Sequence, residues 1–400
     1  MASLLTLEEA QERVLARAQP LPAELVPIAQ ANGRVAAEDA RAVVDLPPFA
    51  SSAMDGFAVR AAGVSAALRI AGESAAGRPF EGRLDAGSCV AISTGAVVPE
   101  DADAVVPVED VVVHDNTVEI PADVRSGSNV RPRGGDVAAG EVVVPAGASL
   151  NPARLAAAAA AGIGALRCAR RPMVTVLATG SELVLPGESL RPGEIYEANG
   201  FMLAAALTTA GADVRVEPSV ADDEGALRES LERALATDVL VTSGGVSVGE
   251  HDLVRAVERE LGVEEVFWRV AIKPGKPVSF GAREGVLVFG LPGNPVSALV
   301  GCELFVKPAL RALQGLADAL PRFERGELMT PLRRNGDRDE FVRARAHLAH
   351  DALMLEPVIG QESHMIVRSS AADALVHVPR GNGELDAGSS VRWVRLGVGC

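Results

Sequence analysis

Lysine is nearly absent from this 400-residue sequence, because only Lys273, Lys276 and Lys307 accompany the arginines among 38 basic residues. Aromatic residues make up 3% of the chain while hydrophobic residues reach 48%, so the interior is expected to be aliphatic. Two of the three lysines flank the Pro-Gly turn of Ile272–Pro277. In a chain this dependent on arginine, the pair indicates that compact ammonium groups are required there, with chance clustering as the competing interpretation.

Further absences restrict the class of protein. The four cysteines, Cys89, Cys168, Cys302 and Cys400, show no metal-binding or CxxC spacing, which is typical of a reduced cytoplasmic protein. No apolar run approaches the roughly 18 residues that span a bilayer, and Met1–Thr6 lacks the basic residues of a signal peptide. The net charge of −15 argues against nucleic acid or an anionic membrane as a partner. We therefore expect a soluble, cytoplasmic, acidic protein.

The length and the hydrophobic pattern predict several domains. From Arg171 the sequence alternates strand, turn and helix, which predicts a parallel α/β sheet with helices on both faces. Residues 68–145 read as short strands and glycine turns, and a compact β domain is expected after Pro321. Near the start, Thr6–Glu9 forms a capping box that opens a helix to about Ala18, and a second short helix is predicted at Leu25–Ala31.

Three glycine-rich loops follow predicted strands: Thr179–Glu182, Ser243–Asp252 and Gly290–Ser297. Loops after the carboxyl ends of parallel strands share one edge of a sheet, so these loops are expected to converge. Bare N–H groups in such loops cradle phosphate, and Glu250 and Asp252 favour a divalent cation between carboxylate and phosphate. The structural alternative is a tight turn with Asp252 as a helix N-cap.

Isolated polar residues in the β segments are weaker candidates. Asp55 precedes Gly56, and this Asp-Gly pair is either a ligand-binding loop or an ordinary turn. Asp136 closes the stretch from Arg131, where a surface ion pair is the alternative interpretation. In the C-terminal β domain, the candidates for reaching a ligand are Arg338, Arg343 and Ser363.

The ordered motifs resemble one family. The chain is similar to the molybdopterin molybdenumtransferases, the MoeA family, which includes the E domain of gephyrin. The motifs that carry the resemblance span most of the chain and are Pro48–Gly56, Arg133–Asp136, Thr179–Leu183, Ile195–Asn199, Ser243–Asp252, Ile272–Pro277 and Gly290–Ser297.

The resemblance implies a multidomain α/β plus β fold in which a central doubly wound α/β domain of the molybdopterin-binding type is joined by β domains. The expected parts are a helical and extended linker domain at 1–45 and 139–170, an inserted small β domain at 46–138, the central domain at 171–322 and a C-terminal β-barrel at 323–400. The family also implies a homodimer with its site at the subunit interface.

The implied reaction inserts molybdenum from molybdate into adenylylated molybdopterin and releases AMP, with Mg²⁺ required. The residues expected to act in catalysis are Asp55, Asp136, Glu182, Asp252, Lys273 and Lys276, of which Asp55, Glu182 and Asp252 are the expected metal ligands. The residues expected to bind substrate are Thr94, Thr179, Gly180, Ser181, Asn199, Ser243, Gly244, Gly245, Ser247, Gly249, Arg269, Pro292, Gly293, Asn294, Pro295 and Ser363. Within this set Lys273, Lys276 and Arg269 are expected to attract molybdate.

The chain departs from the family pattern at Ser181, Gly135 and His251, and the first two positions lack a carboxylate that the family often carries. Two alternatives stay open. A molybdopterin adenylyltransferase shares the central α/β fold but needs only that module, so the added β domains favour insertion. A non-catalytic cofactor carrier or scaffold would keep the fold without the carboxylates and lysines that this chain retains. An adenylyltransferase is also a possible partner.

Overall fold

The computed structural model describes residues 4–62, 64, 67–221, 223–245, 253–349 and 352–397. It divides into two compact units, one made of residues 1–24, 33–35 and 169–400 and the other of residues 25–32 and 36–168. Among the helices described, none has both the length and the apolar character needed to cross a membrane.

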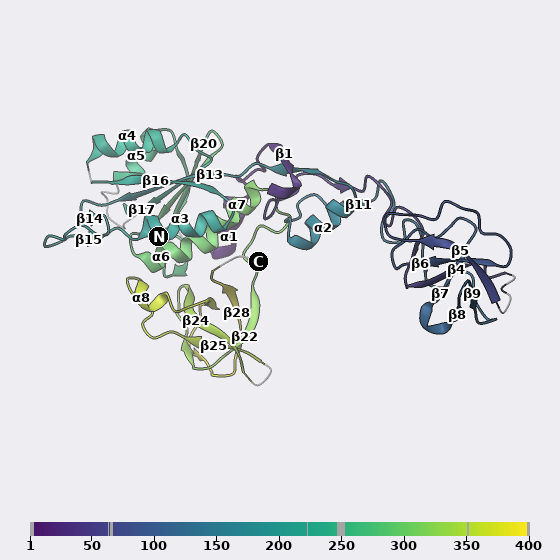
Figure 1. The fold of residues 1–400 in the computed structure, drawn as a ribbon. Helices are drawn as coiled ribbons and strands as arrows, with labels where there is room; N and C mark the ends of the chain where they lie inside the picture. Colours follow the sequence, from purple (N-terminus) through teal and green to yellow (C-terminus); the bar gives the residue numbers. More distant parts are fainter. Residues whose placement is uncertain are drawn as a thin grey trace. The chain divides into compact units, whose positions relative to one another are not determined.

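A six-stranded sheet forms the centre of the first unit (Figure 1). Its strands, in spatial order, are β16 (Asp213–Val220), β13 (Met173–Thr179), β17 (Val239–Ser243), β21 (Val286–Leu291), β20 (Ser279–Arg283) and β18 (Glu264–Trp268). The first four run parallel, as the sequence predicts. The sheet is nevertheless mixed, because β20 and β18 are antiparallel. A two-residue turn at Glu284 and Gly285, both with positive φ, folds β21 back onto β20 as a hairpin.

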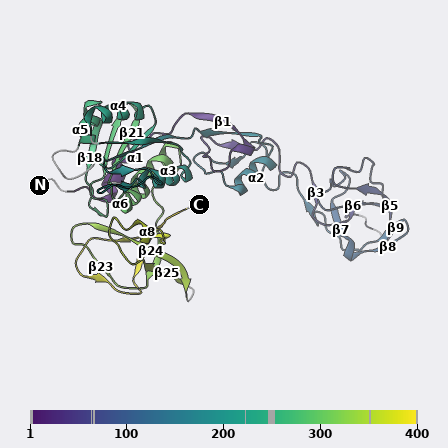
Figure 2. The same ribbon diagram turned by 60° about the vertical axis from the view of Figure 1, so that its left-hand side comes forward.

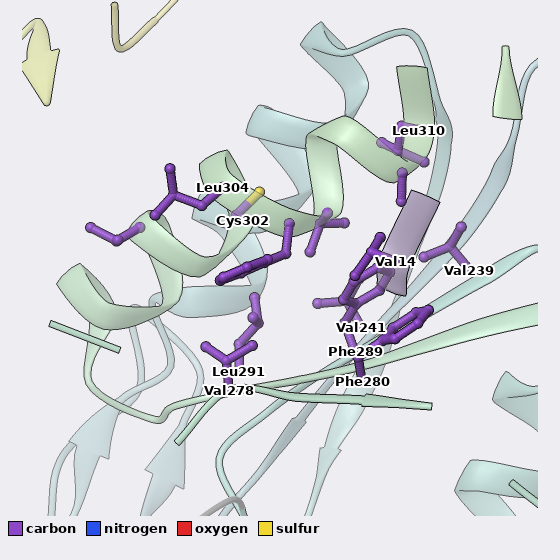
Figure 3. Packing of buried hydrophobic residues seen from close by; sticks show 14 of the residues in the cluster. Val14, Val239, Val241, Val278, Phe280, Phe289, Leu291, Cys302, Leu304 and Leu310 are labelled. Atoms are coloured by element: carbon purple, nitrogen blue, oxygen red, sulfur yellow. The ribbon is translucent and has the colours of Figure 1, made fainter. Parts of the chain in front are cut away.

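Helices cover both faces of this sheet, which confirms the doubly wound prediction. One face is covered by α1 (Leu7–Leu15), α3 (Asn199–Thr209), α6 (Pro295–Gly301) and α7 (Lys307–Leu313), and the other by α4 (Glu224–Ala234) and α5 (Leu253–Glu260). Successive strand residues alternate between the two cores, because Val239 and Val241 join the first cluster and Leu240 the second. Figure 3 shows Cys302, Leu304 and Leu310 above Val241, Phe280 and Phe289.

The helix that begins at Pro295 contains a π-helical turn at Cys302–Val306 before it continues as α7. At the N-terminus the predicted capping box is confirmed: Thr6 Oγ1 accepts from Glu9 N–H, and the Glu9 carboxylate accepts from Thr6 N–H. Helix α1 ends at Leu15, earlier than the sequence predicts, and it packs on the central core through Leu7, Ala10 and Val14.

The C-terminal part of this unit is a closed five-stranded barrel, as predicted. Its strands close in the order β24 (Asp339–Ala349), β25 (Ala352–Pro357), β22 (Glu324–Leu328), β28 (Ser390–Arg395) and β26 (Ala374–Val378), and β26 then pairs with β24. Trp393 is fully buried in the barrel core. The short strand β19 (Ile272–Lys273) of the lysine turn pairs with β24 and so joins the central domain to the barrel.

The remaining short elements of the first unit are β14 (Leu183–Val184), β15 (Ile195–Tyr196), β23 (Leu332–Arg333), β27 (Glu384–Leu385) and α8 (Ile366–Ser369). Helix α8 lies beside β24 in the view of Figure 2.

The second unit contains a six-stranded sheet of short strands, which fits the predicted β insertion (Figure 2). In spatial order the strands are β7 (Ala104–Pro107), β4 (Gly56–Val59), β6 (Ser88–Ile92), β5 (Ala67–Ser74), β9 (Thr117–Glu119) and β8 (Val112–His114). Its other elements are β2 (Ala40–Arg41), β3 (Ser51–Ser52), β10 (Val130–Arg131), β11 (Val142–Val144), β12 (Ala165–Ala169) and helix α2 (Pro152–Ala160).

The helix predicted at Leu25–Ala31 is wrong. This stretch forms β1 (Ala23–Pro27) followed by a single 3₁₀ turn at Ile28–Gln30. Strand β1 pairs with β12, which is about 140 residues away in the sequence. Because that pairing is long-range, the local pattern of apolar residues could not reveal it.

Candidate functional site

Three loops meet at the carboxyl ends of β13, β17 and β21, as the strand pattern predicts. Gly244 N–H donates to Leu291 O over 3.1 Å, which joins the second loop to the third. A Cβ atom on Gly244 would lie 2.4 Å from Thr179 O, so only glycine permits this approach to the first loop. A Cβ atom on Gly293 would lie 3.7 Å from the Cα atom of Gly244. The chain therefore places bare backbone of all three loops side by side.

Asn199 fastens two of these loops from the start of α3. Its Nδ2 group donates to Ser243 Oγ and to Gly293 O, both over 2.8 Å, and the residue is 8% exposed. Both amide hydrogens are thereby used within the protein. The arrangement makes Asn199 a clamp between the loops after β17 and β21.

The loop after β13 holds an unsatisfied hydroxyl and an exposed carboxylate. Thr179 is buried, and its Oγ1 atom has no hydrogen-bond partner among the described residues. Buried hydroxyl groups normally have a partner, so a ligand group is a natural one here. Glu182 is exposed and its carboxylate folds over Gly180, where a Cβ atom would lie 2.6 Å from Glu182 Oε2. Ser181 between them is exposed.

The lysine turn connects β18 to β20 at the same edge of the sheet. The pairing of β19 with β24 sets Lys273 beside Glu340, and Lys273 Nζ lies 3.0 Å from Glu340 Oε1. Lys276 has no ion-pair partner among the described residues. The two lysines of this turn are thus electrostatically different.

A cavity of about 610 Å³ opens between the lysine turn, the loop after β21 and the barrel. Its walls are formed by Lys273, Pro274, Gly275, Lys276, Pro277, Pro292, Asn294, Ser297, Arg338, Glu340, Gln361, Glu362, Ser363 and His364. The lining contains three basic side chains, Lys273, Lys276 and Arg338, and the two carboxylates of Glu340 and Glu362. A hydrogen bond of 3.0 Å from Val296 N–H to Ser363 O fixes the barrel segment against α6.

Two predicted cationic residues lie elsewhere. Arg269 does not line the cavity, because its backbone has φ of 82° and its guanidinium group lies 3.6 Å from the centre of the Trp268 ring. Arg255 lies over the same ring at 3.9 Å. Arg343 is 1% exposed and also does not line the cavity, and burial lowers the pKa of its guanidinium group to about 10. Neither Arg269 nor Arg343 reaches the cavity in this conformation.

The second unit carries the other predicted carboxylates. Asp55 is exposed and its Oδ1 atom accepts the Thr94 N–H over 2.7 Å, so these two predicted residues are brought together. Gly56 is required next to Asp55, because a Cβ atom there would lie 2.0 Å from Val106 O. Asp136 is exposed, and its N–H donates to Leu46 O.

Comparisons with known proteins agree along the whole chain. Residues 5–162 match the MoeA N-terminal region (domain I and II), residues 175–312 match the probable molybdopterin binding domain, and residues 325–396 match the MoeA C-terminal region (domain IV). The chain is 36% identical to the molybdopterin molybdenumtransferase of Haemophilus influenzae over 396 residues, covering 97% of this chain and 98% of that protein. The chain belongs to the molybdopterin molybdenumtransferase family.

Other members of the family show the same extent of similarity. Molybdopterin molybdenumtransferase 2 of Mycobacterium tuberculosis is 37% identical over 382 residues, covering 92% of this chain and 93% of that protein. The solved molybdopterin biosynthesis MoeA protein from Pyrococcus horikosii superposes with a TM-score of 0.83 at 33% identity, covering 98% and 99% of the two chains. Members of this family are transferases of molybdenum cofactor biosynthesis, and the chain is one of them.

Part of the predicted site lies outside the described residues, namely Ser247, Gly249 and Asp252 together with Glu250 and His251. Their place in the site rests on the family resemblance. Within the residues that the structure describes, no group of three or more His, Cys, Asp or Glu side chains is arranged to hold a metal ion.

Sequence reasoning missed several groups in the cavity wall. Glu340, which pairs with Lys273, and Gln361, Glu362 and His364, which follow β25, were not predicted. Ser297 lies within a motif that carries the family resemblance and could have been found there. The neighbourhood of Glu340 depends on the register of β19 with β24, for which the sequence holds no local signal.

Proposed function

We propose that the chain transfers molybdenum from molybdate to adenylylated molybdopterin, with release of AMP and a requirement for Mg²⁺. The observation that carries this proposal is the 610 Å³ cavity, in which the central domain and the barrel together supply three cations at the edge of the phosphate-type loops. Tetrahedral dianions such as molybdate require concentrated positive charge and hydrogen-bond donors in a partly enclosed space.

Within the cavity, Lys276 and Arg338 are the proposed first contacts of molybdate. Neither has an ion-pair partner among the described residues, whereas the charge of Lys273 is offset by Glu340. Ser363 lines the same cavity and offers a hydroxyl group to an oxyanion. Because Glu340 offsets the charge of Lys273, Lys273 is proposed to contribute less to anion binding than Lys276 or Arg338 does.

Neutral donors are proposed to hold the phosphate groups and the pterin. Thr179 offers a hydroxyl group that has no partner among the described residues, and Gly244 and Gly245 in the neighbouring loop are glycines with positive φ.

In the loop after β21, Asn294 makes no side-chain capping bond to α6, so its amide is available to a ligand. Pro292, Gly293 and Pro295 shape the loop around it. Gly180 and Ser181 continue the loop surface after β13 towards Glu182. The hydrogen bond from Asn199 to Ser243 holds the loop after β17 in place.

The carboxylates fit magnesium rather than a metal with a full set of protein ligands. Magnesium usually keeps several waters and binds one or two carboxylates together with substrate phosphate oxygens. Glu182 offers an exposed carboxylate in the first unit, and Asp55 and Asp136 offer exposed carboxylates in the second. An ion held by the ligands that the family resemblance implies would offset charge on the pyrophosphate.

The assembly and the cellular setting form part of the same proposal. A homodimer with its site at the subunit interface, a cytoplasmic location and an adenylyltransferase partner all rest on the family resemblance. Sedimentation of the purified protein tests the first of these, with a dimer as the expected result.

Adenylylation of molybdopterin from ATP is the second candidate reaction, and a carrier without turnover is the third. Insertion is favoured because the barrel, which an adenylyltransferase does not need, lines the cavity with Arg338 and Ser363. The deciding experiment supplies adenylylated molybdopterin and Mg²⁺ and follows AMP with and without molybdate. Release of AMP that depends on molybdate is expected. Formation of adenylylated molybdopterin from ATP would favour the second candidate, and binding without either reaction would favour the carrier.

A further inference from the structure

The barrel carries a second hollow, of about 300 Å³, that plays no part in the proposed reaction. It lies where β24, the end of β25 and α8 come together. Its lining is aliphatic at Val358, Ile359 and Val367, and charged at Arg345, Arg368 and Glu356. This mixture is typical of a surface that binds a partner with both apolar and charged groups.

The aliphatic side chains of this hollow are unusually open to solvent. Ile359 is 81% exposed and Val367 is 83% exposed, which makes them the two most exposed large hydrophobic residues in the part of the chain that the structure describes. Single exposed aliphatic residues need no explanation, but two that flank one hollow form an apolar surface that a ligand can cover.

The arginines of the hollow carry charge that the described residues do not neutralise. Arg345 stands opposite Glu356 in the register of β24 and β25, yet its Nε atom donates to Ala371 O over 3.3 Å and the two side chains form no ion pair. Arg368 lies against Gly360 and also has no ion-pair partner among the described residues. In a chain of net charge −15, this is a local excess of positive charge that is complementary to carboxylates.

One segment of the barrel lines both hollows. Ile359, Val367 and Arg368 face the smaller hollow, whereas Gln361–His364 face the 610 Å³ cavity. Gly360 joins the two parts with φ of 86°, and a Cβ atom there would lie 2.6 Å from Met365 Sδ and 2.7 Å from Arg368 Cδ. A ligand that moves Arg368 or Ile359 therefore acts directly on the backbone that bears Ser363.

We propose that this hollow is a docking site for an acidic segment of a partner protein. An aliphatic or aromatic side chain of the segment would lie between Ile359 and Val367, and carboxylates on either side would pair with Arg345 and Arg368. An extended protein segment fits better than a free small carboxylate, because the apolar side chains stand on an open surface and an extended segment can cover both at once. The docking step is independent of the proposed reaction, and only its effect on the cavity rests on that reaction.

The test uses the full-length protein and a fluorescein-labelled peptide of alternating aspartate and leucine, with binding followed by fluorescence anisotropy. Saturable binding is expected for the wild type and not for a peptide of alternating aspartate and serine. R368E and I359D are expected to weaken binding by at least about tenfold. The matched controls are R325E, an exposed arginine on β22, and L348D, whose side chain is 79% exposed outside the hollow. Both controls are expected to bind as the wild type does.

Several results would overturn the proposal. Absence of wild-type binding, or an equal loss in both controls, would show that the hollow does not recognise this chemistry. A change of oligomeric state in I359D, measured by sedimentation, would assign the surface to a second copy of the chain instead. Saturating peptide is expected to change molybdate affinity by about fivefold or more. An unchanged affinity would show that binding in the hollow does not affect the 610 Å³ cavity. If the proposed reaction is wrong, the wild type shows no molybdate-dependent AMP release, yet it still binds the peptide. The two proposals can therefore fail separately.

Discussion

The two halves of the central sheet present different chemistry along the same edge. The parallel half ends in loops with a hydroxyl group at Thr179 and bare backbone at Gly244, and the amide of Asn199 reaches these loops from the start of α3. The antiparallel half ends at the lysine turn between β18 and β20, which contributes Lys273 and Lys276 to the cavity wall. Neutral donors suit close contact with phosphate and a ring, whereas ammonium groups suit a free dianion. The division predicts that changes in the two halves affect different steps.

The largest effect is expected at Lys276, for which the described part of the chain supplies no ion-pair partner. K276A should lower molybdate-dependent AMP release about a hundredfold, because a charge aimed at the anion is lost from a partly enclosed cavity. Titration of the rate with molybdate should show the loss in the apparent affinity for molybdate. K276R is the matched control and should recover part of the rate. Wild-type molybdate dependence in K276A would contradict the proposed division.

Substitution of Asn199, which joins two loops of the parallel half, should lower the stability of the protein. N199A removes two buried hydrogen bonds and leaves Gly293 O and Ser243 Oγ without them, so the free energy of unfolding should fall by about 1–3 kcal/mol. Urea denaturation measures this difference. N294A is the control, because Asn294 makes no capping bond and its loss should change stability by about 0.5 kcal/mol or less. Equal losses in both variants would show that Asn199 is not a clamp.

A smaller effect is expected at the paired lysine. E340Q removes the carboxylate 3.0 Å from Lys273 Nζ and frees that ammonium group for the anion. Molybdate should then bind about threefold more tightly, since an ion pair of this exposure contributes little. Isothermal titration calorimetry measures the change. The double variant E340Q/K273M should lose the gain, and tighter binding that survives in it would assign the effect to another group.

The smallest effect on function is expected at the opposite edge of the sheet, where Asp238 precedes β17. Burial acts to raise the pKa of Asp238, but hydrogen bonds from Arg170 and from Met173 N–H outweigh it, so the pKa lies below its usual value. A depressed pKa contributes stability above the unfolded pKa of about 3.9, and this contribution is lost as the pH falls through the folded pKa.

D238N tests that linkage by urea denaturation between about pH 6 and pH 2. The stability difference from the wild type should be largest near neutral pH and shrink on acidification, while molybdate affinity stays unchanged. A constant difference across that range, or a loss of molybdate affinity, would contradict the separation between the two edges of the sheet.

Much of the fold follows from local pattern. The capping box at Thr6, the parallel strands from Met173 and the convergence of the loops at Thr179, Gly244 and Gly293 were all predicted, because each depends on short-range periodicity and on the rule that parallel strands share an edge. Strand direction is not encoded in that periodicity, so the sequence predicted a parallel sheet, whereas β18 and β20 run antiparallel in it.

The site could be predicted less completely, because its contacts join distant segments. The position of Glu340 beside Lys273 depends on the register of β19 with β24, and the burial of Arg343 depends on how the barrel packs. Arg269 illustrates the same limit, since its side chain stacks on the preceding Trp268 and does not point into the cavity. Residue type and motif predict candidate residues, but tertiary packing determines which of them line the same cavity.

The chain contains only two tryptophans, and they occupy contrasting surroundings. Trp393 is buried in the barrel core, where the guanidinium group of Arg395 lies 5.0 Å from the centre of its ring. Two guanidinium groups, those of Arg255 and Arg269, lie over the ring of Trp268 at the end of β18. Positive charge held against an indole ring changes the electric field across it, so a movement of either arginine would alter that field. The emission spectrum of Trp268 is therefore expected to report a rearrangement of these two arginines, with Trp393 in the barrel as a second emitter.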